Sequence, residues 1–320
     1  MRIAFAGVAH SHPFSDARSA RALGVDEFAV WDADDHARRA DFVSTWSARP
    51  HDSLADMLDG APDVVVVTPR PQRIVPVVAA VLDRGIACFL NKVPAASPAA
   101  LDALDTAIGT RAERFLTASV LRFAPAVRAL GEELAGEEPV AVHVSVRHDI
   151  DVFTTPERRW QDDPGDGGGT AISMGLHAWE MLDAVVSGPV TALSGVAARI
   201  PGSRTISENT VAVHGLTHSG APVTVDVVGA GTGECYEVVV HTGSGVRRAT
   251  PGLDPEGLGY LDCFRAVLAM AGGAASPVPW ERSRAVLRTT LTAAQRARAG
   301  SIRSTAASTR ARSSAGSAGA

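Results

Sequence analysis

Lys92 is the residue whose type is most unusual for this chain. Among 30 Lys and Arg residues it is the one Lys, and it stands in the segment CFLNKVP at positions 88–94. An Arg side chain cannot lose its proton in a protein, whereas a Lys in a dry cleft can lose and regain one. We therefore interpret Lys92 as a titratable amine at a functional site rather than as a solvated surface cation.

His177 is a second candidate for acid–base chemistry. It lies in the segment GGGTAISMGLHAWE at positions 167–180, in which three glycines lead into a predicted helix. Ser173, His177 and Glu180 are four and three residues apart there, so their side chains can share one face of that helix. An imidazole titrates near neutral pH, but a His on a helix is often a structural hydrogen-bonding group, and this spacing leaves both interpretations open.

The segment GVAHSH at positions 7–12, which we call the first-strand turn, ends the apolar strand predicted at residues 2–8. Dinucleotide-binding proteins carry G-x-G-x-x-G at such a turn, and here Gly7 is the only one of the three glycines. Ala9 still allows a close backbone approach, while His12 replaces the third small residue. The helix after the turn offers free N–H groups and the positive end of its dipole to a pyrophosphate.

Asp32 stands 25 residues after Gly7, at the end of the second predicted strand. At this place in a dinucleotide-binding domain, a carboxylate accepts hydrogen bonds from the ribose hydroxyls of NAD and repels the 2′-phosphate of NADP. The alternative is that Asp32 caps the following helix. The turn and the acid together indicate a site for NAD, with NADP less favoured.

Over residues 1–120, apolar strand-like runs alternate with helical patterns. The expected strands are 2–8, 28–31, 63–68, 86–90 and 114–120, and the expected helices are 13–23, 35–46, 72–84 and 98–108. This alternation is typical of right-handed βαβ units that build an open parallel sheet. Ligands bind at the carboxyl ends of the strands in such sheets, which is where Gly7, Asp32 and Lys92 stand.

Beyond residue 121, strand-like runs follow one another with few helices between them, which indicates an antiparallel sheet. The expected strands are 141–147, 191–198, 210–216, 223–228 and 236–241, and the expected helices are 124–135, 257–271 and 280–298. The predicted fold class is α/β, with an N-terminal Rossmann doubly wound parallel sheet and a C-terminal α+β domain with an open, mainly antiparallel sheet. We expect a dinucleotide-binding domain at 1–120, a substrate and dimerisation domain at 121–300, and a disordered Ala/Ser/Arg tail at 301–320.

The composition is that of a globular protein with two domains. Of its 320 residues, 46% are hydrophobic and 20% are charged, which is enough apolar surface for two cores. A net charge of −5 argues against nucleic acid as a partner. No apolar run approaches the ~18–20 residues of a membrane span, and the start MRIAFAGV lacks signal-peptide organisation, so we expect a cytoplasmic protein that does not bind membranes. Cys88, Cys235 and Cys263 have no C-x-x-C spacing and are expected to be buried thiols.

Taken together, these motifs resemble the glucose-fructose oxidoreductase / inositol dehydrogenase / rhizopine catabolism (Gfo/Idh/MocA) family over about residues 2–299. The segment 167–180 is similar to that family's GG…D-x-G-x-H-x-x-D signature, Asn91-Lys92 to its E-K-P motif, and RFAP at 122–125 to the element that opens its second domain. The resemblance implies nicotinamide-dependent oxidation or reduction of sugars and cyclitols. It also implies a homo-oligomer, such as a dimer, that forms through the open C-terminal sheet.

The resemblance further implies roles for individual residues. Lys92 and His177 would be catalytic and would handle the proton of the substrate hydroxyl as hydride passes to or from the nicotinamide. The expected contacts to NAD are Gly7, Ala9, His10, Ser11, His12, Asp32, Thr68, Pro69, Asn91 and Lys92. The expected contacts to a small-molecule substrate are Arg122, Trp160, Ser173 and Glu180. No metal is expected.

Three departures from the family pattern keep other functions open. Asn91 replaces the Glu of E-K-P, Val93 separates the lysine from its proline, and Ser173 stands where the family has an Asp. One alternative is therefore a protein that binds cofactor or sugar without net redox turnover, such as a lyase, an epimerase-like enzyme or a sensor. Another is a metal-dependent hydrolase that uses His10 and His12, although the second half conflicts with the rhythm of a βα barrel.

Overall fold

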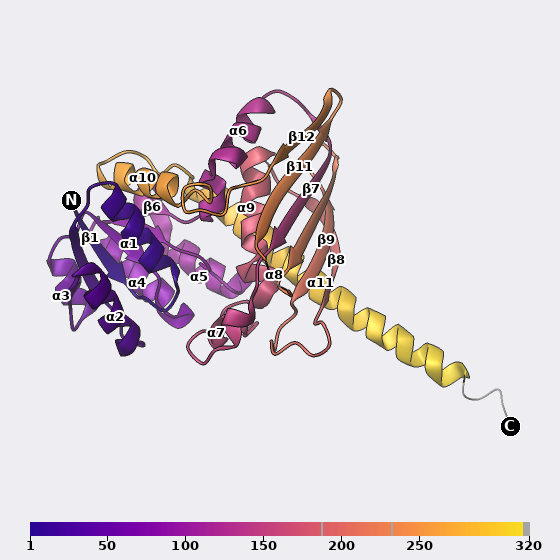
Figure 1. The fold of residues 1–320 in the computed structure, drawn as a ribbon, viewed down its shortest axis with the longest axis horizontal. Helices are drawn as coiled ribbons and strands as arrows, with labels where there is room; N and C mark the ends of the chain where they lie inside the picture. Colours follow the sequence, from indigo (N-terminus) through magenta and orange to yellow (C-terminus); the bar gives the residue numbers. More distant parts are fainter. Residues whose placement is uncertain (187, 232, 316–320) are drawn as a thin grey trace.

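The run of four valines at 64–67 forms strand β4 (Val64–Val67) in the middle of the first sheet. All four side chains are buried, because a β-branched run of this kind packs against helices on both faces of a parallel sheet. The computed structural model describes residues 1–186, 188–231 and 233–315. Figure 1 shows the first sheet in one half of the molecule and a second sheet in the other half.

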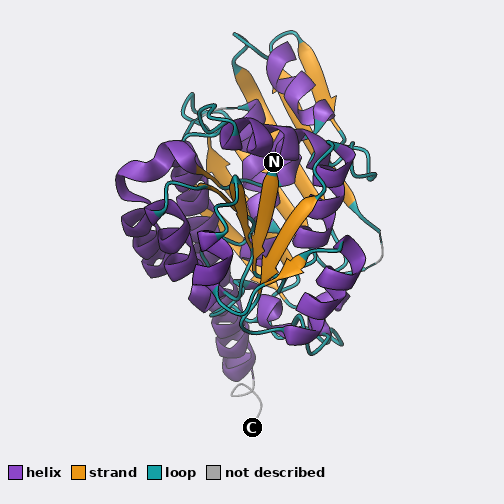
Figure 2. Cartoon of the chain, turned by 90° about the vertical axis from the view of Figure 1, so that its left-hand side faces the viewer, coloured by secondary structure: helices purple, strands orange, loops and turns teal. Residues whose placement is uncertain are grey.

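Sheet A has parallel strands in the order β3-β2-β1-β4-β5-β6. The other strands are β1 (Arg2–Ala6), β2 (Glu27–Trp31), β3 (Arg49–Pro50), β5 (Ala87–Leu90) and β6 (Phe115–Leu116). The helices between them are α1 (His12–Ala22), α2 (His36–Trp46), α3 (Leu54–Asp59), α4 (Pro71–Asp83), α5 (Pro98–Ile108) and the 3₁₀ helix η1 (Gly109–Arg114). β1 pairs with both β2 and β4, so the strand order reverses there and leaves a crevice at the carboxyl ends. The predicted Rossmann sheet is confirmed, and Figure 2 shows helices on both of its sides.

Local sequence accounts for the helix beginnings in this half. The Ser97 hydroxyl accepts a hydrogen bond from the backbone N–H of Ala100 at 3.2 Å, and Pro98 follows at the first turn, where an N–H has no helical partner. Pro71 begins α4 in the same way. These starts place each helix directly after the carboxyl end of a strand, so loops and helix starts gather at one edge of sheet A.

Sheet B has the strand order β12-β11-β7-β10-β9-β8. Its strands are β7 (Pro139–Arg147), β8 (Thr191–Ala198), β9 (Thr210–Leu216), β10 (Pro222–Val228), β11 (Cys235–Thr242) and β12 (Gly245–Ala249). β7 and β10 are parallel and the other neighbours are antiparallel, which confirms the predicted mainly antiparallel sheet. Every second residue of β7, from Val142 to Val146, is buried, so one face of the sheet carries the core.

Helices cover one face of sheet B, the face that lies toward sheet A in Figure 1. They are α6 (Pro125–Glu133), α8 (Gly169–Ser173), α9 (Gly175–Val185) and α11 (Trp280–Ala315). The connection from sheet A runs through the 3₁₀ helix η2 (Val120–Phe123), and the loop after β7 contains η3 (Asp151–Thr154) and α7 (Arg159–Asp162). Two sheets with helices between them therefore bring the carboxyl edge of sheet A close to α9.

Helix α10 (Tyr260–Ala271) packs on sheet A, although the sequence analysis places it in the second domain at 121–300. Its buried Phe264 and Val267 belong to the same core cluster as Phe5 and Phe89. The chain thus returns to the Rossmann half after it has built sheet B, because the apolar face of α10 completes a core there. The division of the chain into two continuous segments needs this correction.

Helix α11 continues past the helix expected at 280–298 and into the tail expected to be disordered at 301–320. The backbone is helical through residue 315, because the segment 301–315 contains neither Gly nor Pro to end it. Residues 316–320 lie outside the described residues. Gly300 lets α11 lie against β8, since a Cβ at this position would lie 2.2 Å from the carbonyl oxygen of Gly195.

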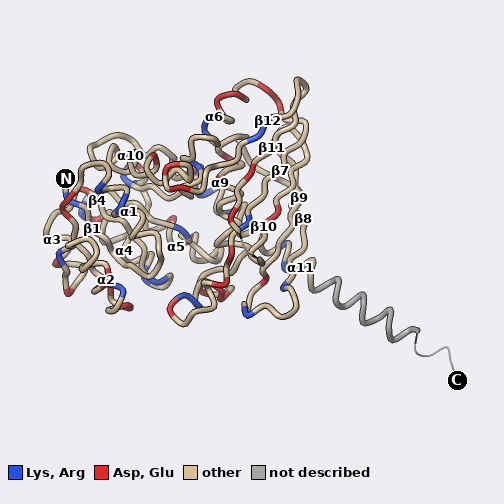
Figure 3. Tube along the Cα trace, viewed as in Figure 1, with Lys and Arg blue, Asp and Glu red and all other residues tan. Residues whose placement is uncertain are grey.

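None of the helices that the structure describes is long and apolar enough to cross a membrane. Figure 3 shows acidic and basic residues interspersed over both halves of the molecule.

Gly7→Ala should lower the free energy of unfolding by about 3 kcal/mol or more. Gly7 has a φ of +96°, and a Cβ there would lie 2.3 Å from the backbone nitrogen of Pro69. Gly24→Ala is the matched control, because Gly24 has a φ of +84° but open space around it, so its loss should be about 1–2 kcal/mol. Urea denaturation of both variants measures the difference, and equal losses would show that the close approach to Pro69 does not matter.

Candidate functional site

The predicted catalytic residues meet at a cavity of about 340 Å³ between the two halves of the chain. The first-strand turn contributes His10, Ser11 and His12, the segment after β5 contributes Lys92, and α9 contributes His177. A cavity of this size suits a small polar molecule. The site thus lies at the carboxyl edge of sheet A, where the strand order predicts it.

Lys92 is buried, with 5% of its surface exposed. Its Nζ donates a hydrogen bond to the carbonyl oxygen of Ser173 at 3.3 Å, and it forms no ion pair within the part of the chain that the structure describes. Burial and, to a smaller degree, the positive charge of Arg158 lower the pKa of Lys92 to about 7, while the charge of Glu234 acts in the opposite direction. Near neutral pH, Lys92 is therefore present both as an amine and as an ammonium, as a proton-exchanging group must be.

Asn91 fixes the backbone that carries this amine. Its Nδ2 donates to a carboxylate oxygen of Asp16 at 2.7 Å, and its Oδ1 accepts from the backbone N–H of Lys92 at 2.9 Å. Asp16 itself is buried, which raises the pKa of its carboxyl well above the ordinary value. Asn91 is uncharged, so it positions the backbone at Lys92 without adding a negative charge that would favour the ammonium form.

His177 is buried beside Lys92 and hydrogen-bonds through Nδ1 to the Oγ of Ser119, 2.5 Å away. Burial lowers the pKa of His177 well below its ordinary value, and the charges of Lys92, His12 and His148 act in the same direction. The imidazole is therefore neutral at physiological pH. A neutral ring can either accept or donate a proton at the nitrogen that faces the cavity.

Asp32 shapes the first-strand turn. One of its oxygens accepts from the backbone N–H of Val8 at 2.6 Å, and the other accepts from the N–H groups of Asp34 and Asp35, each at 2.8 Å. The cap of α2 is Asp35, whose carboxylate accepts from Arg38, so the alternative that Asp32 caps this helix is wrong. Three N–H groups occupy three of about four lone-pair sites, which leaves one for a ligand hydroxyl.

Buried polar atoms without partners lie around the crevice, and they fit a bound dinucleotide. Within the described residues, His12 Nδ1, Thr68 Oγ1 and Ser173 Oγ are buried and make no hydrogen bond. Leaving such an atom unpaired costs about 1–3 kcal/mol, which a polar ligand at the end of β4 would recover. Pro69 follows Thr68 and packs on Gly7, so the first-strand turn can lie against the end of β4 only because residue 7 lacks a side chain.

Arg122 and Glu180 were expected to contact substrate, but they form an ion pair with each other. Arg122 also pairs with Asp183, which in turn accepts from Arg282 at 2.6 Å. A buried charge requires such partners, and this network holds η2 against α9. Neither Arg122 nor Glu180 lines the cavity.

Trp160 also lies away from the cavity lining, contrary to its predicted contact with substrate. The guanidinium of Arg70 lies over its ring at 5.2 Å from the centroid, so Trp160 contributes to a contact between the two halves. Ser173 is the predicted substrate contact that the structure does bring to Lys92, through its carbonyl oxygen.

The cavity also contains polar residues to which the sequence analysis gave no catalytic or cofactor role. His148, Asp149 and Arg158 were candidate pocket residues that the sequence could not distinguish from surface contacts, whereas Glu234, Tyr236 and Tyr260 were not singled out. They come from loops and element ends that are far apart in the sequence, so no spacing pattern links them. For His148, the sequence signal was its position directly after a predicted strand. The hydroxyl of Tyr236 donates to the carboxylate of Glu234, which fixes both side chains beside the cavity.

Within the described residues, no three His, Cys, Asp or Glu side chains are placed to hold a metal ion. The rings of His10 and His12 are 4.3 Å apart between centroids, and His10 Nδ1 accepts from the backbone N–H of His12 at 3.2 Å. The hydrolase hypothesis also requires a βα barrel, whereas this chain forms two open sheets.

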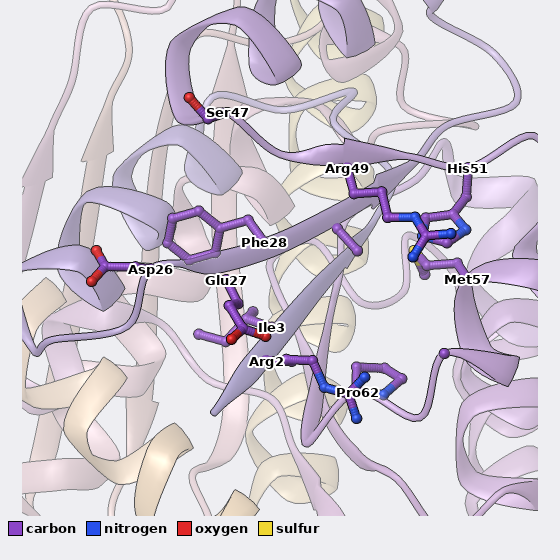
Figure 4. A pocket seen from close by; sticks show the side chains of 12 residues that line it. Arg2, Ile3, Asp26, Glu27, Phe28, Ser47, Arg49, His51, Met57 and Pro62 are labelled. Atoms are coloured by element: carbon purple, nitrogen blue, oxygen red, sulfur yellow. The ribbon is translucent and has the colours of Figure 1, made fainter.

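A second cavity, of about 460 Å³, lies at the opposite edge of sheet A (Figure 4). Arg2, Glu27, Arg49 and His51 line it, and His51 Nδ1 lies 2.6 Å from a carboxylate oxygen of Asp56. The predicted catalytic and cofactor residues are all absent from its lining. The chemistry indicated by the sequence therefore belongs to the carboxyl edge.

Solved structures share this arrangement over nearly the whole chain. GenD2 from gentamicin A biosynthesis, in complex with NAD, is 19% identical, covers 93% of this chain and 94% of its own, and has a TM-score of 0.78. A myo-inositol dehydrogenase from Corynebacterium glutamicum is 15% identical, covers 94% of this chain and 97% of its own, and has a TM-score of 0.78. An oxidoreductase from Agrobacterium radiobacter, in complex with NAD+, L-tartaric acid and magnesium, is 14% identical, covers 93% and 96%, and has a TM-score of 0.76.

These likenesses establish the fold. No protein-family model matches the sequence, and no curated protein matches it either. The chain therefore has the two-domain fold that the resemblance to the Gfo/Idh/MocA family predicted, with a Rossmann sheet and a second, mainly antiparallel sheet.

The titration of Lys92 can be measured directly, because carbon-13 lysine labels one side chain in this chain. We expect the Cε signal to shift with a midpoint at about pH 7, since burial disfavours the ammonium. Nuclear magnetic resonance across a pH series gives the midpoint, with the urea-unfolded chain as the control for a solvated lysine. A midpoint above pH 9 in the folded protein would contradict the burial of an unpaired amine.

Proposed function

We propose that this chain is an NAD-dependent oxidoreductase that transfers hydride between nicotinamide and a hydroxyl or carbonyl group of a sugar, cyclitol or related small molecule. The observation that carries the proposal is the placement of the Lys92 amine and the neutral His177 imidazole at one cavity beside the first-strand turn. The solved structures with NAD support the cofactor, and the inositol dehydrogenase among them supports the class of substrate.

The residues that would hold the dinucleotide are those around the crevice of sheet A. The first-strand turn would lie under the pyrophosphate, Asp32 would accept from a ribose hydroxyl, and Thr68 and Pro69 would lie beside the nicotinamide half. Asp35 adds negative charge next to Asp32, which disfavours the 2′-phosphate of NADP, whereas the charge of Asp34 is paired with Arg73 at 2.8 Å. When bound, the nicotinamide supplies the acceptor or donor of hydride.

The chain's own residues would manage the proton. In the direction of oxidation, the substrate hydroxyl would lie between Lys92 and His177, where a base with a pKa near 7 is suited to remove its proton. The Ser173 carbonyl restrains the amine through its hydrogen bond at 3.3 Å. Lys92 and His177 are themselves buried, with 5% and 4% of their surface exposed, which limits their contact with bulk water.

One observation favours a second candidate, a protein that binds cofactor or sugar without net redox turnover. Ser173 stands in place of the family's Asp, and its hydroxyl makes no hydrogen bond within the described residues. Retained NAD with no substrate-driven change in cofactor absorbance would support this candidate. The homo-oligomer through sheet B stays a prediction of the sequence analysis.

The stripped protein should bind NADH more tightly than NADPH in a fluorescence titration. Asp32→Asn should weaken NADH binding by about tenfold and reduce the discrimination, because it removes the charge opposite a 2′-phosphate. Asp56→Asn, at the other edge of sheet A, is the matched control and should leave both affinities within about twofold. Failure of the wild-type protein to bind either nucleotide would refute the proposed function.

Lys92→Arg should abolish measurable turnover, a loss of about a hundredfold or more, and leave NADH affinity within a few-fold. The substitution keeps a positive charge but removes a group that can lose its proton near pH 7. Steady-state kinetics on a panel of sugars and cyclitols, combined with the NADH titration, separates catalysis from binding. Near-normal turnover in the Arg variant would exclude proton transfer by Lys92.

A further inference from the structure

Ser119 contacts the ring nitrogen Nδ1 of His177. Its Oγ lies 2.5 Å from that nitrogen, and both side chains are buried, with 1% of Ser119 and 4% of His177 exposed. Ser119 lies between β6 and η2, so it reaches the cavity from the Rossmann half, while His177 comes from α9. The sequence analysis did not single out this serine.

The other candidates for orienting the imidazole make no hydrogen bond to it within the described residues. Glu180, one turn after His177, is paired with Arg122. Ser173, at the place of the family's Asp, makes no hydrogen bond through its hydroxyl within the described residues, and its carbonyl accepts from Lys92. Ser119 is therefore the hydrogen-bonding partner through which the described chain orients the ring.

The hydrogen bonds of Ser119 determine which nitrogen of His177 carries the proton. A hydroxyl has one proton to donate and two lone pairs that accept. The backbone N–H of Leu121 already donates to Oγ at 3.1 Å. If Nδ1–H also donated to Oγ, the hydroxyl proton would be buried without an acceptor in the described part of the chain, which is unfavourable. The hydroxyl therefore donates to Nδ1, and the ring proton is on Nε2.

The protonated nitrogen is the one available to a ligand. His177 lines the cavity beside Lys92, and its Nε2 makes no hydrogen bond to the residues that the structure describes. The groups that face the ring are Lys92, His12, His148 and the ring of Tyr236, at 6.0 Å between centroids. None of them is a carboxylate that would favour the imidazolium, so the neutral tautomer is the relevant form.

We propose that Ser119 is a positioning residue that holds His177 as the Nε2–H tautomer, which meets the substrate oxygen as a hydrogen-bond donor. This role rests on the function proposed above. In the oxidation, the hydroxyl proton goes to the Lys92 amine, the C–H bond breaks, and its electron pair leaves as hydride to the nicotinamide as the carbonyl forms. His177 keeps its proton and stabilises the negative charge that develops on the oxygen.

Nitrogen-15 nuclear magnetic resonance of the His side chains, on the full chain without cofactor or substrate, tests the tautomer. The chain has 10 His, and the signals of His177 are those missing from a His177→Gln variant. We expect an unprotonated Nδ1 and a protonated Nε2 near neutral pH. A protonated Nδ1 in the wild-type protein would overturn the assignment.

Variants of Ser119 test its effect on the ring and on the rate. Ser119→Ala should shift His177 toward the Nδ1–H form and lower kcat by about tenfold or more, with a smaller change in KM. Ser119→Thr keeps the hydroxyl and should restore both. Ser97→Ala is the matched control, because this serine caps α5 outside the cavity, so its loss costs stability without altering His177.

Two results for the variants would overturn the proposal. One is an unchanged tautomer and kcat in Ser119→Ala, and the other is a Thr variant as slow as the Ala variant. The test also separates this inference from the proposed function. A protonated Nδ1 in a protein that binds NADH refutes the inference alone, whereas the expected tautomer in a protein that never binds NADH refutes the function and with it the donor role.

Discussion

The Lys92 side chain is buried. Its amine donates to one backbone carbonyl, that of Ser173, at 3.3 Å, and no carboxylate of the described chain lies at ion-pairing distance. A buried ammonium without a counter-ion is unfavourable, so the amine gives up its proton far more readily than a solvated lysine does. The surroundings preserve this condition. Asn91, next to Lys92 in the chain, is uncharged and hydrogen-bonds to Asp16 and to the backbone N–H of Lys92, so it supplies no counter-ion to the amine.

The same cavity depends on a buried ion-pair network that does not line it. Arg122 in η2 is paired with Glu180 and Asp183 in α9. Ser119 directly precedes η2 and His177 lies in α9, so these ion pairs hold the two hydrogen-bonded residues together. Separating one partner of this buried network would leave an uncompensated charge, so the ion pairs resist small rotations of α9. Arg122 and Glu180, expected as substrate contacts, instead hold η2 against the helix that carries His177.

The sequence predicted the alternating strands and helices of the Rossmann half, the mainly antiparallel second sheet, and the gathering of Gly7, Asp32 and Lys92 at one edge, because periodicity and strand order determine these features. The expectation that His177 joins them came from the resemblance to the Gfo/Idh/MocA family. The sequence did not predict β3, α3 or β12, which are short and have little periodic signal. Nor could it predict which polar groups pair with each other. Glu180 has the spacing to face the cavity, yet it meets Arg122, a residue 58 positions away whose location only the fold determines.

Because α10 packs on sheet A, the core of the Rossmann half is completed only after sheet B has been synthesised. The last strand of sheet A is complete at residue 116, but α10, which joins α1 and α2 on one face of the sheet, begins at residue 260. At ribosomal rates of ~5–20 residues per second, the nascent sheet waits roughly 7–29 s with part of that apolar face uncovered. During this interval, a chain still attached to the ribosome can therefore bind chaperones or aggregate through this apolar surface. A fragment that ends near residue 120 would lack α10, one of the helices that cover its core.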